Sequence, residues 1–266
     1  MKHLISLALV ALFSLTSCTH YHYSPNTLNV PMLQKQHDAS ISIARYTGGE
    51  VKGVEAQAIY SPIKYGGLML NHLKIPRRTN GENGNYTEWG RGSMTEGGIG
   101  AYYPHHPFTL SLFGGYGGGW AENAFENVQG GVYQEESLQS KLHFRRWFLQ
   151  PSLSIRAKWF QFGFGMRRVW LHYAKGDVGY EIDPKELTSI QNIDSKGSFQ
   201  FWENGISLGF NLTGCSITYN NVWLKSRSLK FEDYQFNKNG SNLCFTLNIN
   251  ELWEKAEEPK KKRTNP

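Results

Sequence analysis

Apolar and polar side chains alternate along most of the chain after residue 38, with the period of two that is typical of β-strands. The alternation is clearest in the segment 243–250, where the apolar positions are Leu243, Phe245, Leu247 and Ile249. The same pattern recurs near 108–112, 152–157, 160–167 and 215–220. Each predicted strand therefore has one apolar face and one face of small or polar residues.

The pattern predicts about ten strands, near 39–46, 53–60, 66–75, 93–103, 108–121, 143–157, 159–173, 198–210, 213–223 and 242–250. Their connections alternate between turns of a few residues and long polar segments at 76–92, 123–142, 174–197 and 224–241. This asymmetry is typical of outer-membrane barrels. We therefore predict an all-β fold, an antiparallel transmembrane β-barrel over residues 39–251 with short periplasmic turns and long extracellular loops. Weak alternation near 39–46 and 198–205 leaves eight or twelve strands as alternatives.

Tryptophans mark both ends of the predicted strands. Those at the long-loop ends are Trp89, Trp120, Trp147, Trp170, Trp202 and Trp223, and those at the short-turn ends are Trp159 and Trp253. Indole rings favour the two interfaces of a bilayer, so this placement indicates two aromatic girdles. Alternation alone does not tell inside from outside, and a soluble lipocalin-like barrel with an apolar interior is the alternative.

The N-terminus has the layout of a secretory signal. An apolar stretch over 4–15, too short for an ordinary membrane span, leads into Leu15, Thr16, Ser17 and Cys18. This order is that of a bacterial lipobox, in which the cysteine is acylated and becomes the first residue of the mature protein. We predict a lipoprotein signal peptide over 1–17, lipidation of Cys18 and a periplasmic tether over 18–38; an ordinary signal peptide is the alternative. An even strand number would place both termini at the periplasmic side.

The net charge indicates which classes of partner to expect, and the positions of the cysteines indicate whether a disulfide forms. The formal net charge is +6, but part of it lies in the run 260–263 within a predicted basic periplasmic tail, 252–266. An exported protein meets little nucleic acid, so we predict no nucleic-acid partner and expect outer-membrane lipid and an extracellular ligand or envelope protein instead. Cys215 and Cys244 fall on opposite strand faces, so we predict no disulfide between them.

Charged and amide side chains occupy the polar face of several predicted strands. They are Glu55, Gln57, Glu96, Arg156, Arg167 and Glu203. A barrel of about ten strands encloses little more than packed side chains, and buried charges must be paired or hydrated. We therefore predict a polar network that fills the lumen; a polar path or a small ligand site is the alternative. The glycine run 114–119 continues a strand, so it indicates room for a neighbouring ring rather than a nucleotide-binding loop.

Histidines give only weak candidates for chemistry. His143 and His172 lie towards the long-loop ends of adjacent strands, where a histidine could act as a general base for lipid or peptide modification. No nucleophile is fixed near them by the sequence. No spacing of histidine or acidic residues enforces a metal site, so we predict neither a metal nor another cofactor.

The tether and the first hairpin resemble a known family. Tyr23, Pro25, Asn29, Pro31 and Leu33, followed by the segment 53–62, resemble outer-membrane β-barrel lipoproteins of the Bacteroidota type, and the segments 99–103 and 150–152 fit as well. The resemblance implies a secreted, lipid-anchored barrel and supplies no catalytic residues. We expect a non-enzymatic surface or envelope protein that binds partners or serves a structural role through its long loops. An outer-membrane enzyme with rim histidines and a lipid-anchored carrier of an apolar ligand are the alternatives.

Overall fold

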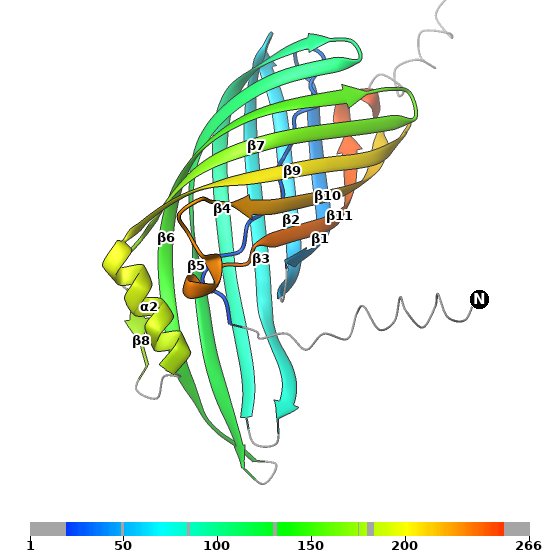
Figure 1. The fold of residues 1–266 in the computed structure, drawn as a ribbon. Coiled ribbons are helices and arrows are strands. Elements are labelled where there is room, and N and C mark those ends of the chain that lie inside the picture. Colours follow the sequence, from blue (N-terminus) through cyan, green and yellow to red (C-terminus); the bar gives the residue numbers. More distant parts are fainter. Residues whose placement is uncertain are drawn as a thin grey trace, which may run out of the picture.

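The computed structural model describes residues 20–48, 51–83, 86–129, 132–174, 176–179 and 184–252. Within them an 11-stranded antiparallel sheet closes on itself through the pairing of β5 with β6 (Figure 1). Only the two-residue β8 lies outside the closed wall, so the wall has the ten strands that the alternation predicts. Closure pairs the backbone groups of every wall strand on both sides, which is the condition for spanning a bilayer with strands.

The wall strands follow one another around the barrel in chain order, with each strand antiparallel to its neighbours. They are β1 (Ala39–Gly48), β2 (Val51–Ile63), β3 (Gly66–Asn83), β4 (Tyr86–His105), β5 (Phe108–Gln129), β6 (Val132–Arg156), β7 (Phe160–Tyr173), β9 (Ser198–Leu212), β10 (Cys215–Lys225) and β11 (Asn239–Asn248). The connections at the long-loop end hold β8 (Asp177–Val178), the helix α2 (Pro184–Lys196) and the 3-10 helix η1 (Phe231–Tyr234).

Two of the segments predicted as long loops are largely strand. β3 pairs with β4 as far as Asn83 and Tyr86, and β5 pairs with β6 as far as Gln129 and Val132. A polar sequence without apolar alternation forms strands here because the ladder of backbone hydrogen bonds needs no buried face. The long-loop end is therefore built mainly of projecting β-hairpins, with α2 and η1 in the other two connections.

The apolar face of the strands lies outside the barrel. Ile41, Ile99 and Leu110 are 53%, 70% and 57% exposed, whereas the alternate positions point inward and are buried. A carrier needs the opposite arrangement, so the lipocalin-like alternative is wrong. The predicted separation of the two cysteines is confirmed: both are free, with Cys244 buried inside and Cys215 on the outward parity.

Most of the described tryptophans are at least partly exposed on the outer wall, where the predicted girdles would lie. Trp147, Trp159, Trp170 and Trp202 are exposed on the outer wall. Trp89 is the exception, because its ring is buried between arginine side chains. Among the described residues, no helix has the length and apolarity that crossing a bilayer requires.

The chain before β1 does not form the predicted tether. Tyr21 donates its backbone N–H to Asn123 Oδ1 near the far end of β5 (3.2 Å), whereas Gln34 Nε2 donates to Thr109 Oγ1 near the start of the same strand (2.7 Å). The segment therefore runs the length of the lumen, seen in blue inside the barrel in Figure 1. We call residues 20–34 the luminal segment.

This path corrects the predicted position of the N-terminus. The first described residue, His20, lies at the long-loop end beside Glu186 of α2, while Leu252 lies beside Gly214 in the short β9–β10 turn. The two described termini are thus at opposite ends of the barrel. An even strand number fixes only where β1 begins, and the residues before it are numerous enough to return through the lumen. The signal peptide, Cys18 and most of the basic tail lie outside the described residues.

Candidate functional site: the closed lumen

Four charged side chains from the wall meet at the middle of the lumen. We call them the central cluster: Glu96 of β4, Arg146 of β6, Arg167 of β7 and Glu203 of β9. Arg146 Nη2 lies 2.7 Å from Glu96 Oε2, and Arg167 Nη1 lies 2.8 Å from Glu96 Oε1. Arg167 Nε donates to Glu203 Oε2 at 2.5 Å. The two glutamates and two arginines balance in charge, and all four are at most 1% exposed.

The luminal segment adds hydrogen bonds to this cluster. Asn26 bridges opposite charges, because its Nδ2 donates to Glu96 Oε1 and its Oδ1 accepts from Arg167 Nη2, both at 2.8 Å. Tyr23 donates its hydroxyl to Glu203 Oε1 at 2.5 Å. Buried charges are tolerated when paired and hydrogen bonded, so the wall and the segment depend on each other.

A second polar cluster surrounds Glu55 on β2. Its carboxylate accepts from Thr27 Oγ1 at 2.8 Å, from Gln57 Nε2 at 2.9 Å and from Asn242 Nδ2 at 2.6 Å. Thr27 belongs to the luminal segment, whereas the other donors belong to the wall. This carboxylate is satisfied by neutral donors, in contrast with the ion pairs of the central cluster.

Below these clusters the wall binds the main chain of the luminal segment. Gln150 Nε2 donates to the Asn29 carbonyl at 2.8 Å, and Ser154 Oγ donates to the Pro31 carbonyl at 2.7 Å. Glycines make room for the segment's side chains: a Cβ on Gly205 would lie 2.8 Å from Leu28 Cδ1. The inner surface of the wall is thus complementary in shape to the luminal segment.

At the long-loop end the segment is held by α2. His22 Nε2 lies 2.9 Å from Glu186 Oε1, and Ser189 Oγ lies 3.2 Å from His22 Nδ1. Burial acts to raise the pKa of the Glu186 carboxyl, but the neighbouring His22 and His20 imidazoles hold its pKa well below the usual value. Asn123 and Ser140 also donate to this carboxylate. We call this arrangement the histidine latch.

The three side chains of the histidine latch are connected in the same order as a Ser–His–carboxylate triad, but a substrate cannot reach them. Ser189 is 3% exposed, and His22 and Glu186 are fully buried. A nucleophile must reach its substrate, so these contacts fix the luminal segment to α2 rather than perform catalysis.

The glycine run on β5 accommodates wall side chains, as its continuation of a strand predicts. A Cβ on Gly115 would lie 2.3 Å from the Phe148 ring, and one on Gly119 would lie 2.7 Å from the Phe144 ring. A Cβ on Gly117 would lie 2.5 Å from Glu96 Cβ. The run therefore leaves space for two aromatic rings and for one member of the central cluster.

Five of the six residues predicted for the lumen point into it. Glu96, Arg167 and Glu203 meet in the central cluster, and Glu55 and Gln57 form the second cluster. Arg156 lies instead at the short-turn end, where it pairs with Glu251.

Neither Arg146 nor the passage of the luminal segment through the barrel was predicted from the sequence. Arg146 follows Arg145 directly, yet it shares its parity with the inward Phe148, Gln150 and Ser152. That parity was the available signal. The segment offered no comparable signal, because it has no apolar period.

The two candidate catalytic histidines lie on the outer wall. His143 and His172 are exposed, and His172 Nδ1 lies 3.0 Å from Ser198 Oγ. Among the described residues, no carboxylate contacts either ring to complete a triad, and no group of three or more metal-ligating side chains forms. The geometry gives the enzymatic alternative no support.

No family model and no curated protein matches the chain. Among solved structures, Ail, the attachment invasion locus protein of Yersinia pestis, is similar at 12% identity and a TM-score of 0.36, over 80% of this chain and 98% of that one. Neisserial surface protein A is 10% identical over 79% of this chain and 92% of its own, with a TM-score of 0.22. The outer membrane protein OprD from Pseudomonas aeruginosa is 6% identical over 85% and 96%, with a TM-score of 0.24. These TM-scores are too low to support an argument. The assignment of the fold as an outer-membrane barrel therefore rests on the closure of the sheet and on its apolar outer wall.

Proposed function

We propose that the chain is a lipid-anchored outer-membrane β-barrel that acts as a non-enzymatic binding or structural protein of the cell surface. The observation that carries this proposal is the luminal segment, which fills the barrel with the chain's own residues. A channel needs a continuous path of water, and a carrier needs an empty apolar cavity. The buried ion pairs across the middle of this lumen leave no room for either.

The surface that remains for partners is the long-loop end. There β3–β4 and β5–β6 project as hairpins beyond the short β1–β2 hairpin, next to α2 (Figure 1). Loops on a rigid scaffold are where recognition usually resides. The histidine latch joins α2 to the luminal segment, so α2 is held from inside the barrel.

A conductance measurement tests the closed lumen. Detergent-extracted full-length protein is inserted into planar bilayers, with heat-modifiable mobility on a gel as the check that it is folded and a porin as the positive control. We expect no steady ionic conductance from the heat-modifiable protein. A steady conductance proportional to voltage would refute the closed barrel.

The lipid anchor belongs to the same proposal. Acylation of Cys18 would place lipid within two residues of His20, a reach of about 7 Å at most. We therefore propose that the anchor enters the leaflet on the side of the projecting hairpins, the outer leaflet. Incorporation of an alkyne fatty acid by the full chain, and its loss in Cys18→Ala, tests the acylation.

The side of the membrane is tested by labelling intact cells. A membrane-impermeant maleimide is applied to Thr19→Cys and, as control, to Lys64→Cys in the short β2–β3 turn, both with Cys215 and Cys244 changed to serine. We expect labelling of Thr19→Cys on intact cells and of Lys64→Cys only after permeabilisation. The reverse pattern would contradict the proposed orientation.

A further inference from the structure

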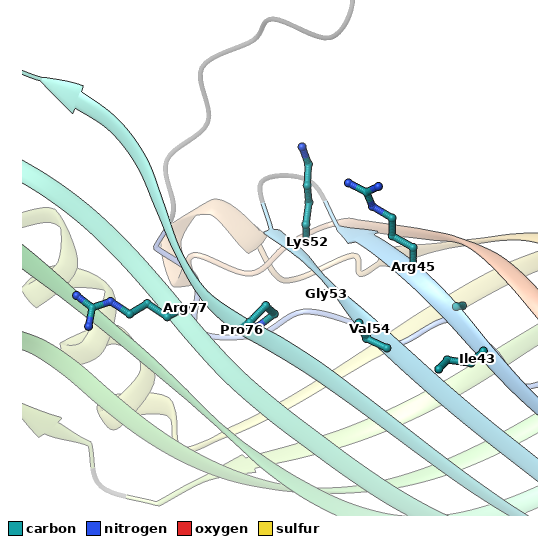
Figure 2. Close-up of a pocket in the computed structure, with 8 residues that line it drawn as sticks. Ile43, Arg45, Lys52, Gly53, Val54, Pro76 and Arg77 are labelled. Atoms are coloured by element: carbon teal, nitrogen blue, oxygen red, sulfur yellow. The ribbon is translucent and has the colours of Figure 1, made fainter.

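A shallow groove of about 590 Å³ lies on the outer wall at the long-loop end of β1, β2 and β3 (Figure 2). Its lining combines apolar and cationic side chains: Ile43, Arg45, Lys52, Val54, Pro76 and Arg77. No acidic side chain lines it among the residues that the structure describes. Nothing in the closed lumen uses these residues.

The groove forms at the point where β2 and β3 stop pairing with each other. β2 pairs with β3 only up to Val54 opposite Lys74, and the β3–β4 register then shifts between Ile75 and Arg78. A bulge of this kind bends a strand and re-aims its side chains, which leaves both Pro76 and Arg77 exposed. β3 continues past the end of the β1–β2 hairpin, so its edge forms one wall of the groove.

Exposed cationic side chains lie next to exposed apolar side chains in this groove. Arg45 and Lys52 are exposed and point the same way in Figure 2, and neither forms an ion pair with a described residue. The Arg77 guanidinium lies 4.5 Å from the centre of the Trp89 ring, which fixes the position of its charge. Towards the membrane, Ile43 is 59% exposed and Val54 is 49% exposed, and they continue into the apolar outer wall. The groove is therefore complementary to an anionic amphiphile.

We propose that this groove binds the phosphorylated glycolipid of the outer leaflet, lipid A, with its phosphates on the cations and its acyl chains on the apolar wall. The inference rests on the proposed orientation, which puts the long-loop end at that leaflet. Arg45 and Lys52 come from the adjacent strands β1 and β2, whereas the Arg77 side chain on β3 points away from them in Figure 2. Cations at two separate places suit a headgroup with two separated phosphates better than the single phosphate of a phospholipid. Charge-assisted hydrogen bonds supply the attraction.

Binding is tested with full-length protein in detergent by native mass spectrometry. The test variant is Arg45→Gln with Lys52→Gln, and the matched control is Arg145→Gln with Lys225→Gln, which removes two exposed cations elsewhere on the wall. The probes are lipid A with two phosphates, the same lipid A after dephosphorylation, and phosphatidylglycerol. We expect the test variant to lose affinity for intact lipid A by about tenfold or more and the control to stay within about twofold.

The other outcomes overturn the proposal. Equal losses in the two double variants would mean general charge attraction, and equal binding of dephosphorylated lipid A would mean that the cations have no role. Phosphatidylglycerol bound as tightly as lipid A would assign the groove to phospholipid. Because this assay is done in detergent, its failure is distinguishable from failure of the proposed orientation, which the labelling of intact cells tests separately.

Discussion

The two halves of the luminal segment are held in different ways. Residues 21–27 contact charged side chains, as in the contacts of His22 with Glu186, Tyr23 with Glu203 and Asn26 with Arg167. Residues 28–34 are bound by neutral groups of the wall, such as Gln150 and Ser154, which donate to the Asn29 and Pro31 carbonyls. The first half is therefore coupled to buried charges, whereas the second half is held by hydrogen bonds to neutral groups of the wall.

The surroundings of the two halves differ accordingly. Rings pack around the first half, where the Tyr23 ring centre lies 5.7 Å from that of Phe144 and 5.5 Å from that of Phe201. Beside the second half is a polar space of about 60 Å³ lined by residues such as Gln161, Ser207 and Thr218. Charges that are shielded from water must be paired, so the comparison predicts large effects in the first half and small ones in the second.

The largest effect is expected in the central cluster. Arg167→Leu leaves two buried carboxylates with one arginine, so we expect a loss of about 3–5 kcal/mol in the free energy of unfolding. Denaturant unfolding of the purified barrel in detergent measures it. Arg168→Leu is the control, because the neighbouring arginine lies outward and stacks on Trp202. Similar losses for the two variants would show that the cluster is not a closed ionic network.

The second-largest loss of stability is expected at the histidine latch. Glu186→Gln keeps the shape but removes the charge that accepts from His22, so we expect a loss of about 1.5–3 kcal/mol near neutral pH. A carboxyl whose pKa is lowered on folding stabilises the fold above its unfolded pKa, about 4.3, and loses that contribution as pH falls. The difference between wild type and variant should therefore shrink in acid. A difference that is independent of pH, measured by unfolding between neutral and acidic pH, would contradict the latch.

Packing against the segment gives an intermediate effect. Gly205→Ala places a methyl group against Leu28, so we expect a loss of about 1–3 kcal/mol. Gly114→Ala is the matched control, since its Cβ would meet nothing closer than 3.7 Å. Adding Leu28→Ala should restore part of the stability of Gly205→Ala, and unfolding of the double variant measures this coupling. Strictly additive losses would place Leu28 away from Gly205.

The smallest effect is expected from one bond in the second half. Ser154→Ala removes a single neutral donor to the Pro31 carbonyl and leaves no charge unpaired, so we expect a loss of about 0.5–1.5 kcal/mol. The same unfolding assay measures it. A loss as large as that of Arg167→Leu would erase the contrast between the two halves.

The wall could be predicted from the sequence, and the content of the lumen only in part. Barrel strands alternate apolar residues that face outward with small or polar residues that face inward, so about ten strands could be predicted from the sequence. The alternation was weakest near 39–46 and 198–205. Glu96, Arg167 and Glu203 were visible as charges on the polar parity. The luminal segment was not, because it has no period and its contacts join residues far apart in the chain, as from Asn26 to Arg167. Its proline content and polar character were equally consistent with a tether.

A disulfide can test whether residues 20–34 pass through the closed barrel. A Cβ at Gly205 would lie 2.9 Å from Leu28 Cγ, where the sulfur of Leu28→Cys would lie. We therefore combine Leu28→Cys with Gly205→Cys, with Cys215 and Cys244 changed to serine, and use Leu28→Cys with the outward Leu208→Cys as control. Peptide mapping without reductant should find the 28–205 disulfide in most of the heat-modifiable protein and none in the control. A heat-modifiable barrel that lacks this disulfide, while both of its thiols react with maleimide, would show that the segment lies outside the lumen.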